Sequence, residues 1–402
     1  MTQAQAVKIY EQGESFYVPQ FKLTIGGQNL SEQVIRDVLE IKYRDDVEKI
    51  DSFEIRLNNW DAAIRKPKYE PPSDPDEPPL FDLGGFDDPV KKVEVWMGYR
   101  GNLRRMIVGE ITTIEPDFPA SGGLTLSIRG LNVLHRFRTE QHTFAWEKKT
   151  DSQIAEDLGR RPVKKGKPGL GIEVRTQPSD SEPEESYVFM DNRYDIIFLM
   201  NRARRHGYEV VLRVDDEGDE YLYFGPSENR GEPPAPYHLE WGKSLISFRP
   251  TLTMTRQVSE VIVRGWDRRR NRKIEGKATW QDLVPAGSER QRMEALAQAF
   301  GDRREIVTDQ PVHTKKQAED RAKRILKDLL KEMVKGSGST VGLPDLRAGR
   351  RVQITGLGPR FDGEYYVTKT THALGDSGYR TEFEARRENA PQTGGASSGG
   401  GG

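Results

Sequence analysis

The 402-residue sequence contains no cysteine. This absence excludes disulfide bonds, thiol nucleophiles and thiolate metal ligands together, and it suits a protein that folds in a reducing compartment. The sequence also lacks an excess of either charge, because 62 Lys and Arg residues balance 63 Asp and Glu residues to a net charge of −1. Such a chain has no overall electrostatic attraction to nucleic acid or to an anionic membrane.

Long apolar runs are missing as well. The longest purely apolar run covers residues 196–200, far short of the roughly 20 residues of a membrane-spanning helix. The N-terminal residues have neither the basic start nor the apolar core of a signal peptide. We therefore expect synthesis in the cytoplasm of the host or producing cell and no stable insertion into a membrane.

The common motifs of catalysis and cofactor binding are absent. There is no G-x-S-x-G, H-E-x-x-H or Walker A pattern, and no G-x-G-x-x-G that follows a strand. A glycine-rich stretch at 336–342 follows a predicted helix, whereas a phosphate site needs such a stretch before the helix. The six histidines show no metal-ligand spacing beyond the loose pair of His135 and His142. We expect no catalytic residue, cofactor or metal, and no enzymatic activity.

What is present is mainly the two-residue period of β-strands. Apolar and polar residues alternate at 53–57, 93–99 and 124–128, which predicts a mostly antiparallel β domain over residues 1–140. Within it, residues 67–89 are rich in proline and acidic residues, so we expect an exposed or disordered loop. Two roles stay open for this loop: an acidic contact for a basic partner, or a solubilising insertion.

The period then changes and predicts a small α/β domain over residues 141–236. Asp195 is a candidate N-cap for a helix whose buried stripe includes Leu199 and Ala203, and Gly207 is the expected residue after its end. A β-hairpin is predicted directly after this helix. An amphipathic helix that packs on a hairpin needs no function to explain it.

Strand signals return over residues 237–390 and predict a second β domain. The runs 124–132 and 259–267 both end in Arg-Gly, a large apolar residue and Asp or Asn, which suggests an internal repeat. A long amphipathic helix is predicted at 315–335, opened by a capping box of Thr314 and Gln317 and packed against this domain. Its apolar face comprises Ala318, Ala322, Ile325, Leu326, Leu329, Leu330, Met333 and Val334. Residues 391–402 are predicted to be a flexible Gly/Ser tail.

One basic cluster occurs at residues 264–273. With Trp266 as a stacking surface, this cluster could bind single-stranded nucleic acid. The balanced charge of the chain and the position of the cluster at the end of a hairpin favour a solvated face. We expect that nucleic acid is not a primary partner.

The most specific pattern lies at residues 342–387. A Leu-Pro-x-Leu-x-x-Gly segment precedes a short strand, then come Gly-Glu-Tyr-Tyr-Val, His372 and a final Gly-Tyr-x-Thr-x-Phe strand. This series resembles the C-terminal part of the late control protein D family. Its members are the baseplate hubs of contractile-tailed phages, and their relatives include the hub part of the type VI secretion spike. The family positions carried over, all structural, are Gly363, Tyr365, Tyr366, Gly378, Tyr379, Thr381, Phe383, Asp195, Leu199, Ala203 and Gly207.

The resemblance implies a fold and a role. The fold would be α+β and mainly antiparallel β. It would have two related tube-type β-barrel domains with the α/β insert between them and the long helix on the second barrel. Three copies would form a pseudo-six-fold ring that joins a hexameric tail tube to a trimeric spike, within a virion tail or an injection particle. The implied partners are further copies of the chain, the tube protein, the spike protein and surrounding baseplate proteins.

An enzyme is the alternative that the resemblance leaves open. Some hubs carry domains that degrade cell-wall polymers, so the chain could be a tail-associated cell-wall-degrading enzyme. That reaction needs paired carboxylates in a cleft, and the sequence assigns none.

Overall fold

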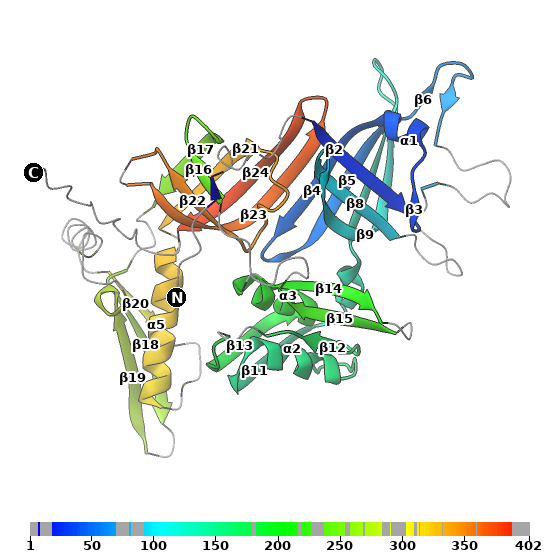
Figure 1. Ribbon diagram of the computed structural model, residues 1–402. Helices are drawn as coiled ribbons and strands as arrows, with labels where there is room; N and C mark the ends of the chain where they lie inside the picture. Colours follow the sequence, from blue (N-terminus) through cyan, green and yellow to red (C-terminus); the bar gives the residue numbers. More distant parts are fainter. Residues whose placement is uncertain are drawn as a thin grey trace, which may run out of the picture.

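The computed structural model describes residues 7–8, 18–69, 80–81, 92–178, 182–206, 208–215, 219–226, 237–253, 258–267, 270–283, 290, 303–308, 312, 314–331, 333–358 and 360–387. Within these ranges, the side chains of residues 7–8, 214, 267, 324, 327–328 and 330–331 are outside the description. Strands dominate and are mostly antiparallel, with a few helices beside them (Figure 1). The predicted α+β class with mainly antiparallel strands is confirmed.

A single 14-stranded sheet contains strands from both ends of the chain. Its main path has the order β1-β16-β22-β23-β4-β5-β10-β9-β8-β2-β3, and β24, β21 and β17 continue from the other side of β23. The strands are β1 (Val7–Lys8), β2 (Pro19–Ile25), β3 (Gln28–Asn29), β4 (Val38–Asp46), β5 (Lys49–Asn58), β8 (Lys92–Tyr99), β9 (Asn102–Asp117), β10 (Thr125–Asn132), β16 (Tyr237–Glu240), β17 (Leu245–Leu252), β21 (Val334–Val341), β22 (Arg351–Thr355), β23 (Gly363–Gly375) and β24 (Gly378–Arg387). The short helix α1 (Glu32–Asp37) precedes β4, and the hairpin of β6 (Trp60–Asp61) and β7 (Lys66–Pro67) follows β5.

The first half of the sheet, β2 to β10, follows the predicted alternation. On β5, Phe53, Ile55 and Leu57 are buried, and the residues between them are more exposed. The inward residues of β8 and β10 join the same core. The strands predicted at 53–57, 93–99 and 124–128 are confirmed, and the third begins one residue later than predicted, at Thr125.

The second half of the sheet, β16, β17 and β21 to β24, has a core of its own around Tyr365 and Phe383. The two halves join where β4 pairs with the later part of β23, from Lys369 opposite Asp46 to Gly375 opposite Glu40. The earlier part of β23 pairs with β22, so one strand belongs to both halves. Among the described strands the sheet is continuous, and its pairing order does not close on itself.

The described residues between 133 and 225 form a second unit, whose core also includes Ile50 of β5. The unit begins with the 3₁₀ helix η2 (Val133–Phe137), and its helices are α2 (Asp151–Arg160) and α3 (Asp195–Arg205). One sheet pairs β11 (Gln141–Lys149) with β13 (Glu185–Tyr194), and the other has the order β12 (Val174–Thr176), β15 (Glu220–Gly225), β14 (Glu209–Val214). Leu199 and Ala203 of α3 are buried in this core, as their helical spacing predicts.

The start of α3 differs from the prediction. The N-cap is Tyr194, whose side chain makes no capping hydrogen bond, and Asp195 is the first helical residue. The Asp195 carboxylate instead accepts a hydrogen bond from the Gly169 N–H at 2.6 Å and faces His142 Nδ1 at 2.9 Å. It therefore ties α3 to neighbouring segments. Gly207 lies outside the described residues.

A small α/β unit projects from the second half (Figure 1). Its sheet has the order β19 (Arg272–Thr279), β18 (Glu260–Asp267), β20 (Arg304–Val307), and α5 (Lys315–Lys331) packs on β18 and β19. The predicted repeat is wrong, because Arg129 and Gly130 lie on β10 of the large sheet whereas Arg264 and Gly265 lie on β18 of this separate one.

The helix predicted at 315–335 is shorter in the structure and packs elsewhere. It ends at Lys331, and Val334 begins β21, so neither Met333 nor Val334 belongs to its apolar face. Pairing of β21 with both β17 and β24 explains the early end, because the small residues at 336–339 fit between two neighbouring strands. The helix covers the small sheet instead of the large one.

The acidic, proline-rich segment is described only at its edges, since residues 70–79 and 82–91 lie outside the described residues. Phe81 is buried in the core of the first half, and its ring lies 5.5 Å from that of Tyr69. Tyr69 Oη donates to Asp37 at 2.8 Å, and Lys68 pairs with the same carboxylate at 2.7 Å. The prediction of an exposed segment is therefore wrong for Phe81, because burial of an aromatic ring outweighs the polar character of its neighbours.

Gly130 occupies a place on β10 that has no room for a side chain. A Cβ there would lie 2.3 Å from the Phe53 ring and from the carbonyl oxygen of Glu110. We expect Gly130→Ala to lower the free energy of unfolding by about 1–3 kcal/mol through overpacking. Gly123→Ala is the matched control, because a Cβ at that position meets nothing within 4 Å. Urea unfolding checks the pair, and equal stabilities would contradict this packing.

Candidate functional site

A buried polar cluster lies where β4, β23 and α3 approach one another (Figure 1). We call it the junction, because it connects both halves of the sheet with the unit that contains α3. It contains two of the family positions named above. The junction comprises Tyr43, Asp45, Asp51, Arg204, Arg347, His372, Tyr379 and Thr381.

His372 is fully buried on β23. Its Nδ1 lies 2.9 Å from the Tyr379 hydroxyl and 3.1 Å from the Thr381 hydroxyl, and its Nε2 lies 3.0 Å from the carbonyl oxygen of Leu346. Burial, together with the charge of Arg347, lowers the pKa of His372 well below its usual value. The ring is therefore neutral. Since a carbonyl oxygen can only accept, Nε2 carries the proton and Nδ1 accepts from the hydroxyls.

Arg347 and Asp45 tie the segment at 342–350 to the first half. Asp45 on β4 accepts hydrogen bonds from the Ala348 N–H at 3.0 Å and from the Thr370 hydroxyl. The Arg347 guanidinium lies 4.7 Å from the centre of the Tyr43 ring, within the range of a cation–π contact. Arg347 also donates to three backbone carbonyls, those of Pro344, Met106 and Arg105.

Hydrogen bonds connect helix α3 to the end of β4, the start of β5 and the turn between them. Arg204 donates to Asp51 at 2.6 Å and to the carbonyl oxygen of Asp46, and Asn201 Nδ2 donates to the carbonyl oxygen of Val47 at 3.2 Å. Burial raises the pKa of Asp51 to about 6, although Arg204 stabilises its charged form. Arg204 therefore sets the position of α3 against the large sheet.

The remaining family positions on β23 and β24 lie outside the junction. Tyr365 and Phe383 pack against the ring of Phe248 in the core of the second half, at centroid distances of 5.3 and 6.0 Å. Tyr366 is half-buried, with the Arg386 guanidinium 5.2 Å from its ring centre.

The two family glycines on these strands have positive φ. Gly378 has a φ of 89°, a left-handed conformation that favours glycine, in the turn between β23 and β24. Gly363 has a φ of 148°, and a Cβ there would lie 3.3 Å from Nε of Arg387. The structure thus brings Tyr379 and Thr381 together with His372 and leaves the other positions apart.

Sequence reasoning missed most of the junction, including Asp45, Arg204 and Arg347. One signal was present for Asp45. The alternation on β4 places Ile41, Tyr43 and Asp45 on the same inward face, and all three are buried. A carboxylate at a core position requires a partner.

The opposite face of the large sheet is polar and crosses both halves. Cross-strand ion pairs join Lys369 to Glu384, and join Arg44 and Arg129 to Glu54. Such pairs on an exposed face each contribute little stability, and they place opposite charges side by side on neighbouring strands.

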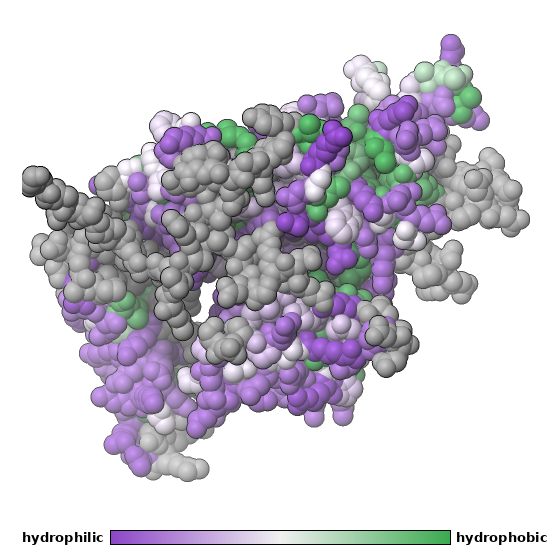
Figure 2. Space-filling view, viewed as in Figure 1, coloured by the Kyte–Doolittle hydropathy of each residue, from purple (hydrophilic) through white to green (hydrophobic). Residues whose placement is uncertain are grey.

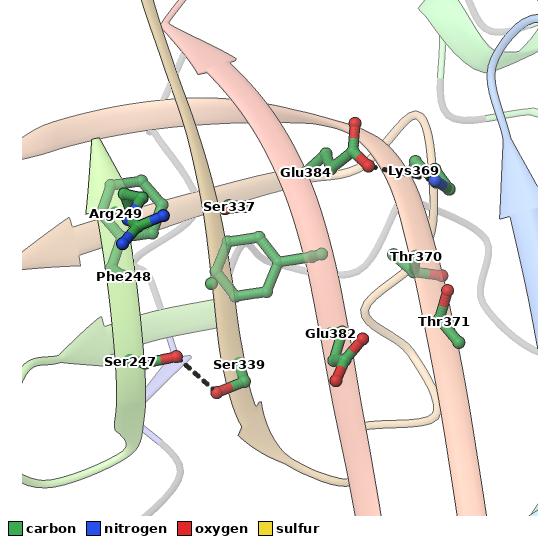
Figure 3. Close-up of a pocket in the computed structure, with 12 residues that line it drawn as sticks. Ser247, Phe248, Arg249, Ser337, Ser339, Lys369, Thr370, Thr371, Glu382 and Glu384 are labelled. Atoms are coloured by element: carbon green, nitrogen blue, oxygen red, sulfur yellow. Dashed lines mark hydrogen bonds and ion pairs between the residues drawn. The ribbon is translucent and has the colours of Figure 1, made fainter. Parts of the chain in front are cut away.

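On this polar face, the small residues of β21 leave a groove of about 570 Å³. Figure 3 shows Ser247 hydrogen-bonded to its cross-strand neighbour Ser339, and Glu384 paired with Lys369. Glu382 and Glu384 are both exposed, so neither is sheltered from water as the general acid of a glycoside hydrolase is. The groove thus offers polar contacts without an evident catalytic pair.

The loose histidine pair does not form a site. His135 faces Glu110 at 2.9 Å, and His142 faces Asp195 at 2.9 Å, so each ring has its own carboxylate. Within the described ranges, no group of three or more His, Asp and Glu side chains could hold a metal ion. In the same ranges, none of the helices has the length and apolar character needed to span a membrane.

Two solved tail proteins are similar in fold to this chain. The 43 kDa tail protein of prophage MuSo2 from Shewanella oneidensis is 15% identical and matches with a TM-score of 0.56, over 92% of this chain and 98% of its own. The tail protein from Neisseria meningitidis MC58 is 14% identical and matches with a TM-score of 0.55, over 92% of this chain and 97% of its own. The chain therefore has the fold of phage tail proteins, and the resemblance found in the sequence is confirmed at the level of the fold.

The sequence itself shows the family to which the chain belongs. The chain belongs to the family described as the Alg8 N-terminal domain, whose pattern matches residues 16–376. No curated protein matches the sequence.

Proposed function

We propose that this protein is a structural baseplate hub of a contractile tail or injection system. Three copies form a pseudo-six-fold ring that joins the hexameric inner tube to the trimeric spike. The observation that carries the proposal is the pairing of β4 with β23, because it places the two halves of the sheet edge to edge. In a tube ring, neighbouring subunits would place their β-sheets edge to edge in the same manner. The fold shared with phage tail proteins supports this role.

In this proposal the halves of the sheet belong to the two related tube-type domains, residues 1–140 and 237–390, with the insert of residues 141–236 at the periphery. The polar face of the sheet lines the channel, where its paired charges let cargo pass without strong binding. Rim loops contact the tube on one side and the spike on the other. The protein is thus part of an assembled virion tail or injection particle, and it makes and breaks no covalent bond.

Among the described residues, two strand edges at opposite ends of the sheet are open, and this favours ring closure. In the second half, β17 pairs with β21 on one side, and on the other it has only a bridge from Trp241 to Leu245 among the described residues. In the first half, β3 covers only Thr24 and Ile25 of β2. An open edge is a template for pairing with another chain. Head-to-tail contact between these edges repeats until the ring closes.

Native mass spectrometry tests the proposal. We expect trimers, and we expect Ile246→Lys on β17 to yield monomers, because its exposed side chain lies on the edge strand that meets the next copy. Ile64→Lys is the matched control, since Ile64 is also exposed, at 63% against 51% for Ile246, but lies in the β6–β7 hairpin of the first half, away from β17. A chain that stays monomeric with its spike protein present would overturn the proposal.

A further inference from the structure

The projecting unit has a sheet face that the proposed hub function does not use. Val261 and Val263 on β18 point towards α5, so the residues between and beside them point away from the helix. No described element covers this second face, which we call the outer face (Figure 1). The outer face comprises Glu260, Arg264 and Trp266 on β18, Lys273, Glu275 and Lys277 on β19, and Arg304 and Ile306 on β20. Ile262 on β18 points the same way but is only 4% exposed, so the accessible part of the face lies around it.

Bases outnumber acids on the outer face. The hydrogen bond from Lys273, together with that from Arg264, lowers the pKa of Glu275 to about 2, so this carboxylate stays charged. Each of the two carboxylates is shared by more than one base, which leaves a surplus of positive charge. The ion pairs join Glu275 to Arg264, Lys273 and Lys277, and join Glu260 to Lys277 and Arg304.

Large apolar side chains are exposed beside these charges. Trp266 is 56% exposed and Ile306 is 50% exposed. The side of the projecting unit that Figure 2 shows is mainly hydrophilic. Tryptophan and arginine are the residues that most often dominate the binding energy of protein interfaces. An exposed tryptophan beside Arg264 and Lys273 therefore has the character of a binding anchor.

We propose that the outer face binds an acidic segment of a partner protein. Trp266 packs against an apolar residue of that segment, and the surplus bases pair with its carboxylates. A protein fits better than nucleic acid because Glu260 and Glu275 lie between the bases, where they would repel a regular chain of phosphates. Among the described residues of the outer face, Trp266 is the single exposed aromatic side chain, which provides no series of stacking surfaces for bases. This inference goes beyond the hub proposal and does not depend on it.

Fluorescence anisotropy of the full chain with a labelled random copolymer of glutamate and tyrosine tests this inference. We expect Trp266→Ala to weaken binding of the copolymer at least about tenfold, the loss of an anchor worth about 1.4 kcal/mol. Trp241→Ala is the matched control, because Trp241 is 59% exposed but lies beside β16. We expect its affinity to stay within about twofold of the wild type, and added salt to weaken binding of all variants.

Three outcomes would overturn the inference. One is equal affinity of wild type and Trp266→Ala for the copolymer. Another is an oligothymidylate that binds as tightly as the copolymer and loses affinity in Trp266→Ala, which would make this a nucleic-acid surface. The third is loss of the trimer in Trp266→Ala, which would make the outer face a contact between copies. Failure of the hub proposal would appear separately, as a wild-type chain that never forms trimers.

Discussion

Replacing Arg204 with methionine should lower the free energy of unfolding by about 3–5 kcal/mol at neutral pH, the usual cost of breaking a buried ion pair. The side chains of Arg204 and Asp51 are only 11% and 13% exposed. Without the guanidinium, the Asp51 carboxylate is left buried without its 2.6 Å partner, and the carbonyl oxygen of Asp46 loses a donor. Urea denaturation near neutral pH measures the loss.

A double variant and a pH series separate this effect from lost packing. Arg204→Met combined with Asp51→Asn removes both charges and should recover most of the stability. Acid should also rescue the single variant. The pKa of Asp51 in the folded protein, about 6, lies above the ordinary value of 3.8, so protonation favours the folded state. Removal of Arg204 takes away a charge that favours the carboxylate, so the pKa of Asp51 lies higher still in the variant. The cost is therefore greatest above that raised pKa, shrinks as the pH falls towards about 6, and stays at its smaller value below it. A cost that is the same at neutral and acidic pH, or a double variant as unstable as the single one, would contradict this role.

The strands were predictable because their signal is local. Burial of Phe53, Ile55 and Leu57 on one face of β5 follows from a period of two residues, which neighbouring side chains alone establish. The same holds for the buried stripe of α3, with its period of 3.6 residues. The order of strands in the sheet is not local, and only the resemblance to baseplate hubs indicated the tail-protein fold.

The junction could not be predicted because its partners lie far apart in the sequence. Arg347 donates to the carbonyl oxygen of Met106, which lies 241 residues away. Arg204 donates to Asp51, which lies 153 residues away. An arginine on a helix or in a loop is usually exposed, and nothing near either arginine in the sequence marks it as buried.

The false repeat has a physical explanation. Both of its glycines lie where a neighbour fills the space of a side chain, but the neighbours are unrelated. A Cβ at Gly130 would lie 2.3 Å from the Phe53 ring in the large sheet, and one at Gly265 would lie 2.5 Å from the Val312 side chain in the projecting unit. The same requirement, a residue without a side chain, therefore occurs at Gly130 and at Gly265 in two different sheets.

Leu326→Ala should lower the free energy of unfolding of the projecting unit by about 2–5 kcal/mol, the range for a truncated core leucine. Leu326 is 1% exposed and lies in the small core that α5 shares with Val261 and Ala322. The helix cannot move closer to refill the cavity, because its backbone already touches β19. A Cβ at Gly276 would lie only 2.2 Å from the backbone nitrogen of Glu319.

Leu329→Ala is the matched control for this variant, since Leu329 lies one turn further along α5 and is only partly buried against the same core. We expect a clearly smaller loss for it, because fewer contacts are removed and water can reach the site. Thermal unfolding of the two variants beside the wild type gives the comparison. If Leu326→Ala left the melting temperature unchanged, α5 would not be seated on β18 and β19, and its apolar face would be free to bind a partner. That result would also remove the reason to regard the outer face as the exposed side of this sheet.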